Sequence, residues 1–153
     1  MTRSIHTAKT SEEILSAVKN AAEEIFPVID GDIFIIDWKS GDLLSLTRES
    51  DYQFSHKIWE YLEEGVIDWV LNNQYPAVIE DLITAESETY TNREGSLIFI
   101  PLLLQDGVRG VIALYTPKPK HTFTSKDFEM LSTAGEEVKK ALDSIIFRQK
   151  QNT

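Results

Sequence analysis

Cysteine is absent from this 153-residue sequence. Its absence excludes disulfide bonds, thiolate metal sites, iron–sulfur clusters, cysteine nucleophiles and cofactors attached through a thioether. Long apolar runs are absent as well: the longest, 97–104, has eight residues, whereas a helix needs about 20 to cross a bilayer. The first residues also lack the apolar stretch of a secretory signal. We therefore expect a cytoplasmic protein that does not contact membranes.

Positive charge is scarce. The sequence holds 15 Lys and Arg against 25 Asp and Glu, a formal net charge of −10. Because nucleic acids are bound largely through contacts between basic side chains and phosphates, this balance argues against nucleic-acid binding. An acidic surface that keeps the chain soluble is the simpler interpretation.

Patterns typical of enzymes and metal sites are also missing. The three histidines, His6, His56 and His121, are far apart in the sequence, and no two have the spacing of a shared metal site. His56 alone leaves two interpretations open, an axial haem ligand or a surface histidine. The sequence shows no phosphate-binding glycine loop, no Ser–His–Asp arrangement and no paired catalytic carboxylates. We expect no metal and no catalytic activity, and we identify no cofactor.

The residues that are present indicate one globular domain. Hydrophobic residues make up 42% and charged residues 26% of the chain, a composition typical of folded proteins. The length fits a single domain. We expect this domain over 11–148, with flexible ends at 1–10 and 149–153.

Helical patterns flank the sequence. Thr10 is followed three residues later by Glu13, and Thr124 by Asp127. A hydroxyl followed three residues later by an acid is the capping-box signal for a helix start. Apolar residues then recur with helical spacing after each signal. The sequence therefore predicts helices over 11–25 and 125–147.

The middle of the chain is rich in strand-forming residues. Apolar runs separated by turn residues predict hairpins over 33–46 and 97–115, and Asp106-Gly107 is a strong turn signal in the second hairpin. Other patterns predict a strand at 76–79, helices at 51–62 and 66–71, and a polar loop at 84–95. Together the elements predict an α+β fold with a central antiparallel sheet of five or six strands.

Five segments in this order resemble the GAF domain family: GVIDWV at 65–70, PAVIED at 76–81, SLIFIPL at 96–102, GVRGVIAL at 107–114 and FTSKDFEML at 123–131. Each segment alone is a loose pattern, but their order is more specific, and the resemblance covers about residues 10–148. A PAS-like topology is the structural alternative, and it should lack the long closing helix.

The resemblance implies both an architecture and a role. The terminal helices should share one face of the sheet, and a small-molecule pocket should lie between the other face and segment 51–95. The family is signalling-related and mostly bacterial, and many members dimerise through their first and last helices. Three of its specialities are missing here: the Asn-Lys…Phe…Asp-Glu signature of cyclic-nucleotide binding, the cysteine that attaches bilins, and the catalytic cysteines of methionine-sulfoxide reduction.

Candidate ligand residues follow from the expected pocket. A small-molecule site combines a rigid apolar lining with a few polar groups. We expect two or more of the apolar candidates to line one cavity, with Asp81 or Arg93 near its mouth; these candidates are Trp38, Trp59, Trp69, Ile98 and Ile100. The alternatives are core packing for the tryptophans, loop capping for Asp81 and a surface ion pair for Arg93.

The terminal helices carry more apolar surface than docking on a sheet requires. We expect the surplus to form a parallel homodimer interface, with these residues at its centre: Leu15, Val18, Leu131, Val138, Leu142 and Ile145. The alternative is that the two helices bury these residues against each other and the sheet.

The predicted function is a sensory or regulatory domain that binds an unidentified small molecule and passes a signal to an unidentified signalling protein. The alternative function is a ligand-free module for dimerisation or protein interaction. The two differ in the space behind residues 54–95, because a sensor needs an open pocket there.

Overall fold

The computed structural model of the chain describes residues 5, 8–37, 39–48, 51–83 and 93–151, with the backbone only at 81–83, 93–94 and 146–151. Its centre is a five-stranded antiparallel sheet with the strand order β2-β1-β5-β4-β3. The strands are β1 (Asp30–Ile36), β2 (Leu43–Ser45), β3 (Ala77–Ile83), β4 (Arg93–Leu103) and β5 (Arg109–Thr116). The α+β fold with an antiparallel sheet is therefore confirmed.

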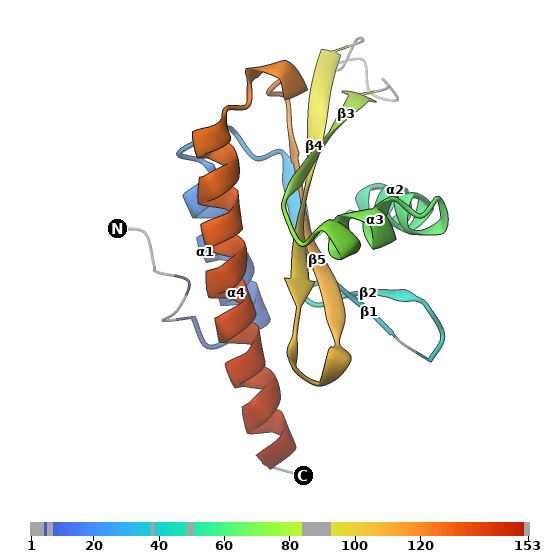
Figure 1. The fold of residues 1–153 in the computed structure, drawn as a ribbon, viewed down its shortest axis with the longest axis vertical. Helices are drawn as coiled ribbons and strands as arrows, with labels where there is room; N and C mark the ends of the chain where they lie inside the picture. The colour runs from blue at the N-terminus through green and yellow to red at the C-terminus, as the bar shows by residue number, and fades with distance from the viewer. Residues whose placement is uncertain (1–4, 6–7, 38, 49–50, 84–92, 152–153) are drawn as a thin grey trace.

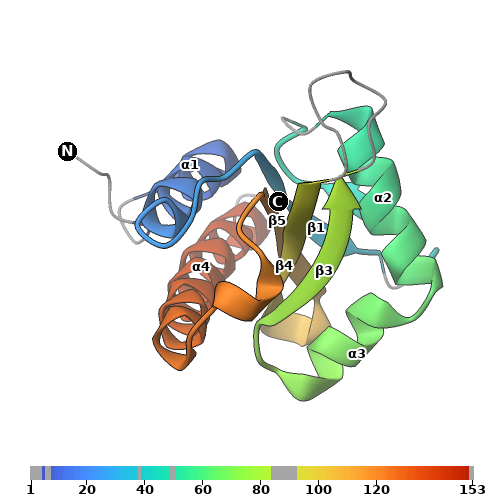
Figure 2. The ribbon, with the colours of Figure 1, turned by 90° about the horizontal axis from the view of Figure 1, so that it is seen from above.

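Four helices cover the sheet: α1 (Ser11–Ala22), α2 (Tyr52–Glu63), α3 (Val66–Asn73) and α4 (Ser125–Gln151). Figure 1 shows α1 and α4 on one side of the sheet and α2 and α3 on the other. The view from above in Figure 2 shows the same three layers. The prediction that the terminal helices share one face is thus confirmed. Within the described residues, no helix is both long and apolar enough to cross a membrane.

Local sequence signals explain where several elements begin and end. The Thr10 hydroxyl accepts a hydrogen bond from the backbone N–H of Glu13 at 3.1 Å. At α4, Thr124 and Asp127 exchange two such bonds, at 3.2 and 3.0 Å. These contacts satisfy N–H groups that a helix start leaves without internal partners.

The β4–β5 hairpin turns at Asp106 and Gly107, whose φ angles are 61° and 74°. Left-handed backbone at two successive positions is what a tight hairpin requires, and Asp-Gly tolerates it. The ladder between β4 and β5 runs without a bulge past Pro101, which pairs with Val111. The β3 ladder ends at Phe99, so Pro101 is paired with a strand, β5, on one side only. A proline is tolerated at such a position because a strand edge without a partner needs no N–H donor.

The two faces of the sheet hold separate apolar clusters. Along β4, Ile98 and Ile100 pack under α1 and α4, whereas Leu97 and Phe99 pack under α2 and α3. Consecutive side chains of a strand point to opposite faces. Because the central strands carry apolar side chains on both faces, the sheet needs a helical layer on each side.

Close packing of α4 on the sheet depends on Gly135. A Cβ atom at this position would lie 2.6 Å from Cγ2 of Ile100. Contacts that short do not occur between carbon atoms, so a larger residue would push α4 away from β4.

The ends of the domain differ from the sequence expectation. Ile5 and Ala8 lie within the segment 1–10 that was expected to be flexible, yet both are buried in the cluster under α1 and α4. At the other end, α4 continues past residue 148 to Gln151. The folded region therefore extends beyond the predicted limits of 11–148.

The residues expected at a dimer interface are core residues of the single chain. Five of the six are buried, namely Leu15, Val18, Leu131, Val138 and Leu142, and Ile145 packs against the same cluster. On the same helix Ala141 is also buried, and Phe128 and Ala134 pack against the same cluster. These residues therefore do not form a surplus stripe, and the intramolecular alternative is correct for them. Homodimerisation itself stays a prediction.

Replacing Leu142 tests this assignment. Leu142→Ala should lower the free energy of unfolding by about 2–5 kcal/mol, since it removes buried methyl groups and leaves a cavity. Urea denaturation followed by circular dichroism measures the change. Ser144→Ala on the exposed side of the same helix is the control, with an expected change within about 0.5 kcal/mol. A Leu142→Glu variant with wild-type stability would contradict the core assignment.

Candidate functional site

The face of the sheet under α2 and α3, here called the cover face, is apolar at its centre. Its buried side chains are Phe34, Ile36, Phe54, Ile58, Ile67, Val70, Leu71, Leu97, Phe99, Val111 and Ala113. The α2 helix contributes Phe54 and Ile58 from one side, and its N-cap is Asp51, whose carboxylate accepts the N–H of Gln53 at 2.6 Å. The cap determines where α2 begins and so which side chains face the sheet.

A buried carboxylate interrupts this apolar face. Asp32 on β1 is 0% exposed. Its Oδ1 accepts hydrogen bonds from the Thr47 hydroxyl at 2.6 Å and from the Ile33 N–H at 2.7 Å. Its Oδ2 accepts one from the Ser45 hydroxyl. Burying a carboxylate is costly unless hydrogen bonds compensate for the lost water, and these three donors supply that compensation. We call Asp32, Ser45 and Thr47 the Asp32 cluster.

Aromatic side chains adjoin the Asp32 cluster. Asp32 and Phe34 are two residues apart on β1 and so point to the same face of the sheet. The ring of Phe34 lies 6.4 Å from that of Phe54, centroid to centroid, at an interplanar angle of 37°. The arrangement sets a fixed polar group beside two buried aromatic rings, which are the residue types that small-molecule sites combine.

A second carboxylate, Asp30, lies two residues before Asp32 at the start of β1. Burial, helped by the nearby Asp51 carboxylate, raises the pKa of Asp30 above its ordinary value. The N–H of Gly31, which donates to Asp30 at 2.7 Å, and the Lys19 ammonium act in the opposite direction. Among the described residues, no group of three or more His, Asp or Glu side chains could hold a metal ion, so these acids are not assembled into a metal site.

Among the predicted ligand residues whose side chains are described, the two isoleucines and the two tryptophans do not share one face of the molecule. Ile98 and Ile100 face α1 and α4, on the opposite side of the sheet from α2 and α3. The prediction for them is wrong because β4 is apolar at every position near its centre, and such a strand carries no pattern that indicates which residues face which helical layer. Trp59 and Trp69 are 41% and 58% exposed and lie on the outside of α2 and α3.

For the remaining ligand candidates, the structure describes the backbone of Asp81 and Arg93. Trp38 lies outside the described residues. Asp81 and Arg93 belong to paired strands, where Asp81 is opposite Gly95 and Arg93 is opposite Ile83. Arg93 is therefore part of β4 rather than of the loop that the sequence predicted over 84–95.

The sequence analysis missed the Asp32 cluster, although a signal for it exists. Phe34 pairs with Ser45 in the β1–β2 hairpin, and the same register continued by two residues sets position 32 opposite position 47. An acid and a hydroxyl at these two positions are cross-strand neighbours on one face. Finding them requires the register of the hairpin, which depends on where its loop begins.

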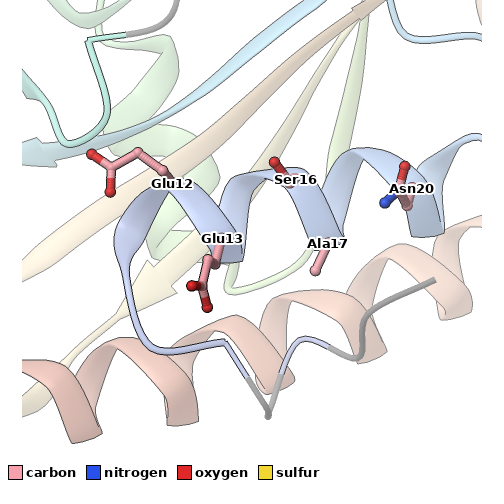
Figure 3. Close-up of a pocket in the computed structure, with 5 residues that line it drawn as sticks. All are labelled: Glu12, Glu13, Ser16, Ala17 and Asn20. Atoms are coloured by element: carbon pink, nitrogen blue, oxygen red, sulfur yellow. The ribbon is translucent and has the colours of Figure 1, made fainter. Parts of the chain in front are cut away.

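A hollow of about 210 Å³ lies beside α1 (Figure 3), lined by Glu12, Glu13, Ser16, Ala17 and Asn20. One of its two carboxylates already serves the fold, since Glu13 Oε2 accepts the N–H of Lys9 at 2.9 Å. All five lining residues belong to α1, and none of them is aromatic. We therefore place the candidate site at the Asp32 cluster.

Comparisons with known proteins give a family and a fold. A family model described as GAF domain matches residues 8–143. A GAF domain from a phosphoenolpyruvate-protein phosphotransferase of Coxiella burnetii superposes with a TM-score of 0.61 at 17% identity, covering 97% of this chain and 90% of that chain. No curated protein sequence matches the chain.

Two other solved structures have a similar fold. A domain assigned to a two-component sensor histidine kinase protein of Sinorhizobium meliloti has a TM-score of 0.62 at 16% identity, covering 95% of this chain and 99% of that one. The photoproduct state of a GAF domain from Synechocystis has a TM-score of 0.61 at 10% identity, with 94% and 100% covered.

Removing the acceptor of the Asp32 cluster should destabilise the fold. Asp32→Ala should lower the free energy of unfolding by about 2–4 kcal/mol, because it leaves buried donors without an acceptor. Chemical denaturation gives the value. Asp42→Ala, an exposed aspartate in the same hairpin, should change it by less than about 0.5 kcal/mol. Equal stability of Asp32→Ala and the wild type would show that the cluster does not hold β2.

Asp30 should make stability depend on pH in a defined direction. Its pKa is higher in the folded chain than in the unfolded chain, so its contribution to stability is present at low pH and is lost as the pH rises through the folded pKa. Asp30→Asn should therefore gain stability relative to the wild type between about pH 3 and pH 6. Thermal unfolding over this pH range measures the difference.

Asp37 supplies a control of opposite sign. The N–H of Lys39 and the hydroxyl of Ser40 lower the pKa of Asp37, so its contribution is present above the unfolded pKa and is lost as the pH falls. Asp37→Asn should be less stable than the wild type near pH 6, and the difference should shrink toward acid. The same trend in both variants would contradict the assignment for Asp30.

Proposed function

This chain belongs to the GAF domain family, and we propose that it is a sensory or regulatory module of a cytoplasmic signalling system, binding a small molecule without converting it. The observation that carries the proposal is the Asp32 cluster, a fully buried carboxylate with two hydroxyl donors on an otherwise apolar, aromatic face. Small-molecule sites have this composition, because apolar walls supply affinity and a few polar groups supply orientation.

The chemistry of the cluster suggests the class of ligand. A carboxylate accepts hydrogen bonds, and a ligand N–H or O–H group can replace a serine or threonine hydroxyl as its donor. The rings of Phe34 and Phe54 favour a flat apolar portion beside that group. We therefore propose a small planar compound with at least one hydrogen-bond donor.

A signal from this face has a physical route to the last helix. Asp143 on α4 is buried and accepts the backbone N–H of Gln105 at 2.8 Å, and the Lys139 ammonium lies 3.3 Å from its second oxygen. These contacts tie α4 to the β4–β5 turn. A shift of the central strands on ligand binding would therefore move α4, which we propose passes the signal to a partner protein.

A ligand-free interaction module is the second candidate function. The specific observation in its favour is the close packing of the cover face. Ile58, Phe99 and Val111 are fully buried in the same apolar cluster. In that case the Asp32 cluster serves only to hold β2 on β1, and function resides on the outer surface.

A thermal-shift screen separates the two functions. The purified chain is heated with a panel of metabolites, and a compound at 100 times its Kd should stabilise the wild type by about 2.7 kcal/mol. Asp32→Asn, checked for folding by circular dichroism, should abolish the shift, whereas Asp42→Asn should retain it. Phe54→Leu should reduce the shift while it keeps an apolar side chain.

The outcomes differ clearly. No shift with any compound would favour the ligand-free module. A shift of equal size in the wild type, Asp32→Asn and Phe54→Leu would place the binding site elsewhere.

A further inference from the structure

The most exposed aromatic residues lie close together in the sequence. Among the described residues, the large hydrophobic side chains with the greatest exposure are Ile29, Leu44, Tyr52, Trp59, Trp69 and Tyr75. The four aromatic residues all lie between positions 52 and 75, on α2, on α3 or just after α3. None of the six belongs to α1 or α4. Among the described residues, the most exposed aromatic side chains therefore belong to α2, to α3 and to Tyr75, whose ring stacks on Phe128 of α4 at 6.1 Å.

Three rings on α2 form a stacked stripe. The rings of Tyr52 and His56 are 6.0 Å apart at 16°, and those of His56 and Trp59 are 5.8 Å apart at 20°. Their spacing of four and three residues puts them on one side of the helix, away from the buried Phe54 and Ile58. Tyr52 is 81% exposed. We call Tyr52, His56 and Trp59 the α2 aromatic stripe.

Acidic residues surround the stripe. Segment 51–75 contains five acids and one base, Lys57, whose ammonium lies 5.4 Å from the ring centre of Tyr115 on the sheet. Glu60 Oε1 lies 3.0 Å from His56 Nε2. Glu63 is exposed and one helical turn after Trp59. The α2 aromatic stripe therefore lies beside exposed carboxylates of the same helix.

We propose that the α2 aromatic stripe docks a segment of a partner protein that is rich in Arg and Lys. A guanidinium or ammonium group is attracted to the face of Trp or Tyr within about 6 Å of the ring. The neighbouring carboxylates accept charge-assisted hydrogen bonds from the same cation, and Arg binds a carboxylate in bidentate fashion. The rings are already stacked in the free chain, so binding orders few side chains.

Charge complementarity selects this occupant over others. An acidic partner or a nucleic acid would bring like charges together, which costs binding energy. A second copy of this chain docked through the same stripe would bring its Glu60 and Glu63 against those of the first copy, because a two-fold interface is self-complementary. A basic segment alone matches both the rings and the acids. This surface is separate from the Asp32 cluster, so the proposal does not depend on ligand binding there.

Fluorescence anisotropy with a fluorescein-labelled peptide of eight arginines at 150 mM salt tests the proposal. Tyr52→Ala/Trp59→Ala should raise the Kd at least fivefold, and Glu60→Gln/Glu63→Gln should do the same. Both variants replace exposed side chains, and circular dichroism checks their folding. On titration with the peptide, amide chemical-shift changes in the wild type should concentrate at residues 51–64.

Two matched controls separate local docking from general attraction to an acidic protein. Glu129→Gln/Glu136→Gln removes the same charge from exposed positions of α4, and Trp69→Ala removes an exposed tryptophan from α3. Each should change the Kd less than twofold.

Three results would overturn the proposal. The first is an equal weakening of peptide binding by the α2 and α4 charge variants. The second is an unchanged Kd in Tyr52→Ala/Trp59→Ala. The third is sedimentation that shows self-association dependent on Tyr52 and Trp59, which would assign the stripe to a second copy.

Discussion

The two-sided apolar character of the central strands is the constraint on which the rest of this structure depends. Leu97, Ile98, Phe99 and Ile100 follow one another on β4, and all four are buried. Because alternate side chains of a strand point to opposite faces, neither face of the sheet can be left to water. The chain therefore needs helices on both sides, and its terminal and middle helices provide them.

The two helical layers cover the sheet with different kinds of contact. The α1–α4 layer is a close-packed support, in which Gly135 lets α4 approach Ile100 and the segment before α1 adds Ile5 and Ala8 to the core. The α2–α3 layer covers an apolar face that also contains the buried Asp32 carboxylate and its hydroxyl partners. A buried polar group in an apolar layer persists only with every partner in place. The cover face therefore depends on polar contacts that, among the described residues, the α1–α4 layer lacks at its centre.

The α2 helix separates two kinds of recognition. Its inward residues Phe54 and Ile58 cover the sheet, whereas Tyr52, His56 and Trp59 stack on its outer side among acids. An aromatic stripe on a helix is usually buried against a core, but here the apolar and the aromatic stripes occupy different sides. A ligand below α2 and a protein partner above it would act on the same helix, which would couple the two sites physically.

The sequence by itself determined the features that depend on neighbours along the chain. The hydroxyl–acid pairs predicted the starts of α1 and α4, Asp106-Gly107 predicted the β4–β5 turn, and the apolar runs separated by turn residues predicted an antiparallel sheet. These signals are local, because a cap or a turn is formed by residues within four positions of one another. They were enough to indicate the family.

Only the tertiary structure decided which apolar surfaces meet. The faces of Ile98 and Ile100 could not be predicted, because a strand that is apolar at every position carries no alternation. The stripe of Leu131, Val138 and Leu142 fits a dimer or a core equally well in sequence, and the presence of α1 beside α4 decided for the core. The Asp32 cluster required the register of the β1–β2 hairpin, which places Thr47 and Ser45, 15 and 13 residues away in sequence, against one carboxylate. Contacts of this kind depend on distances in space that no local pattern encodes.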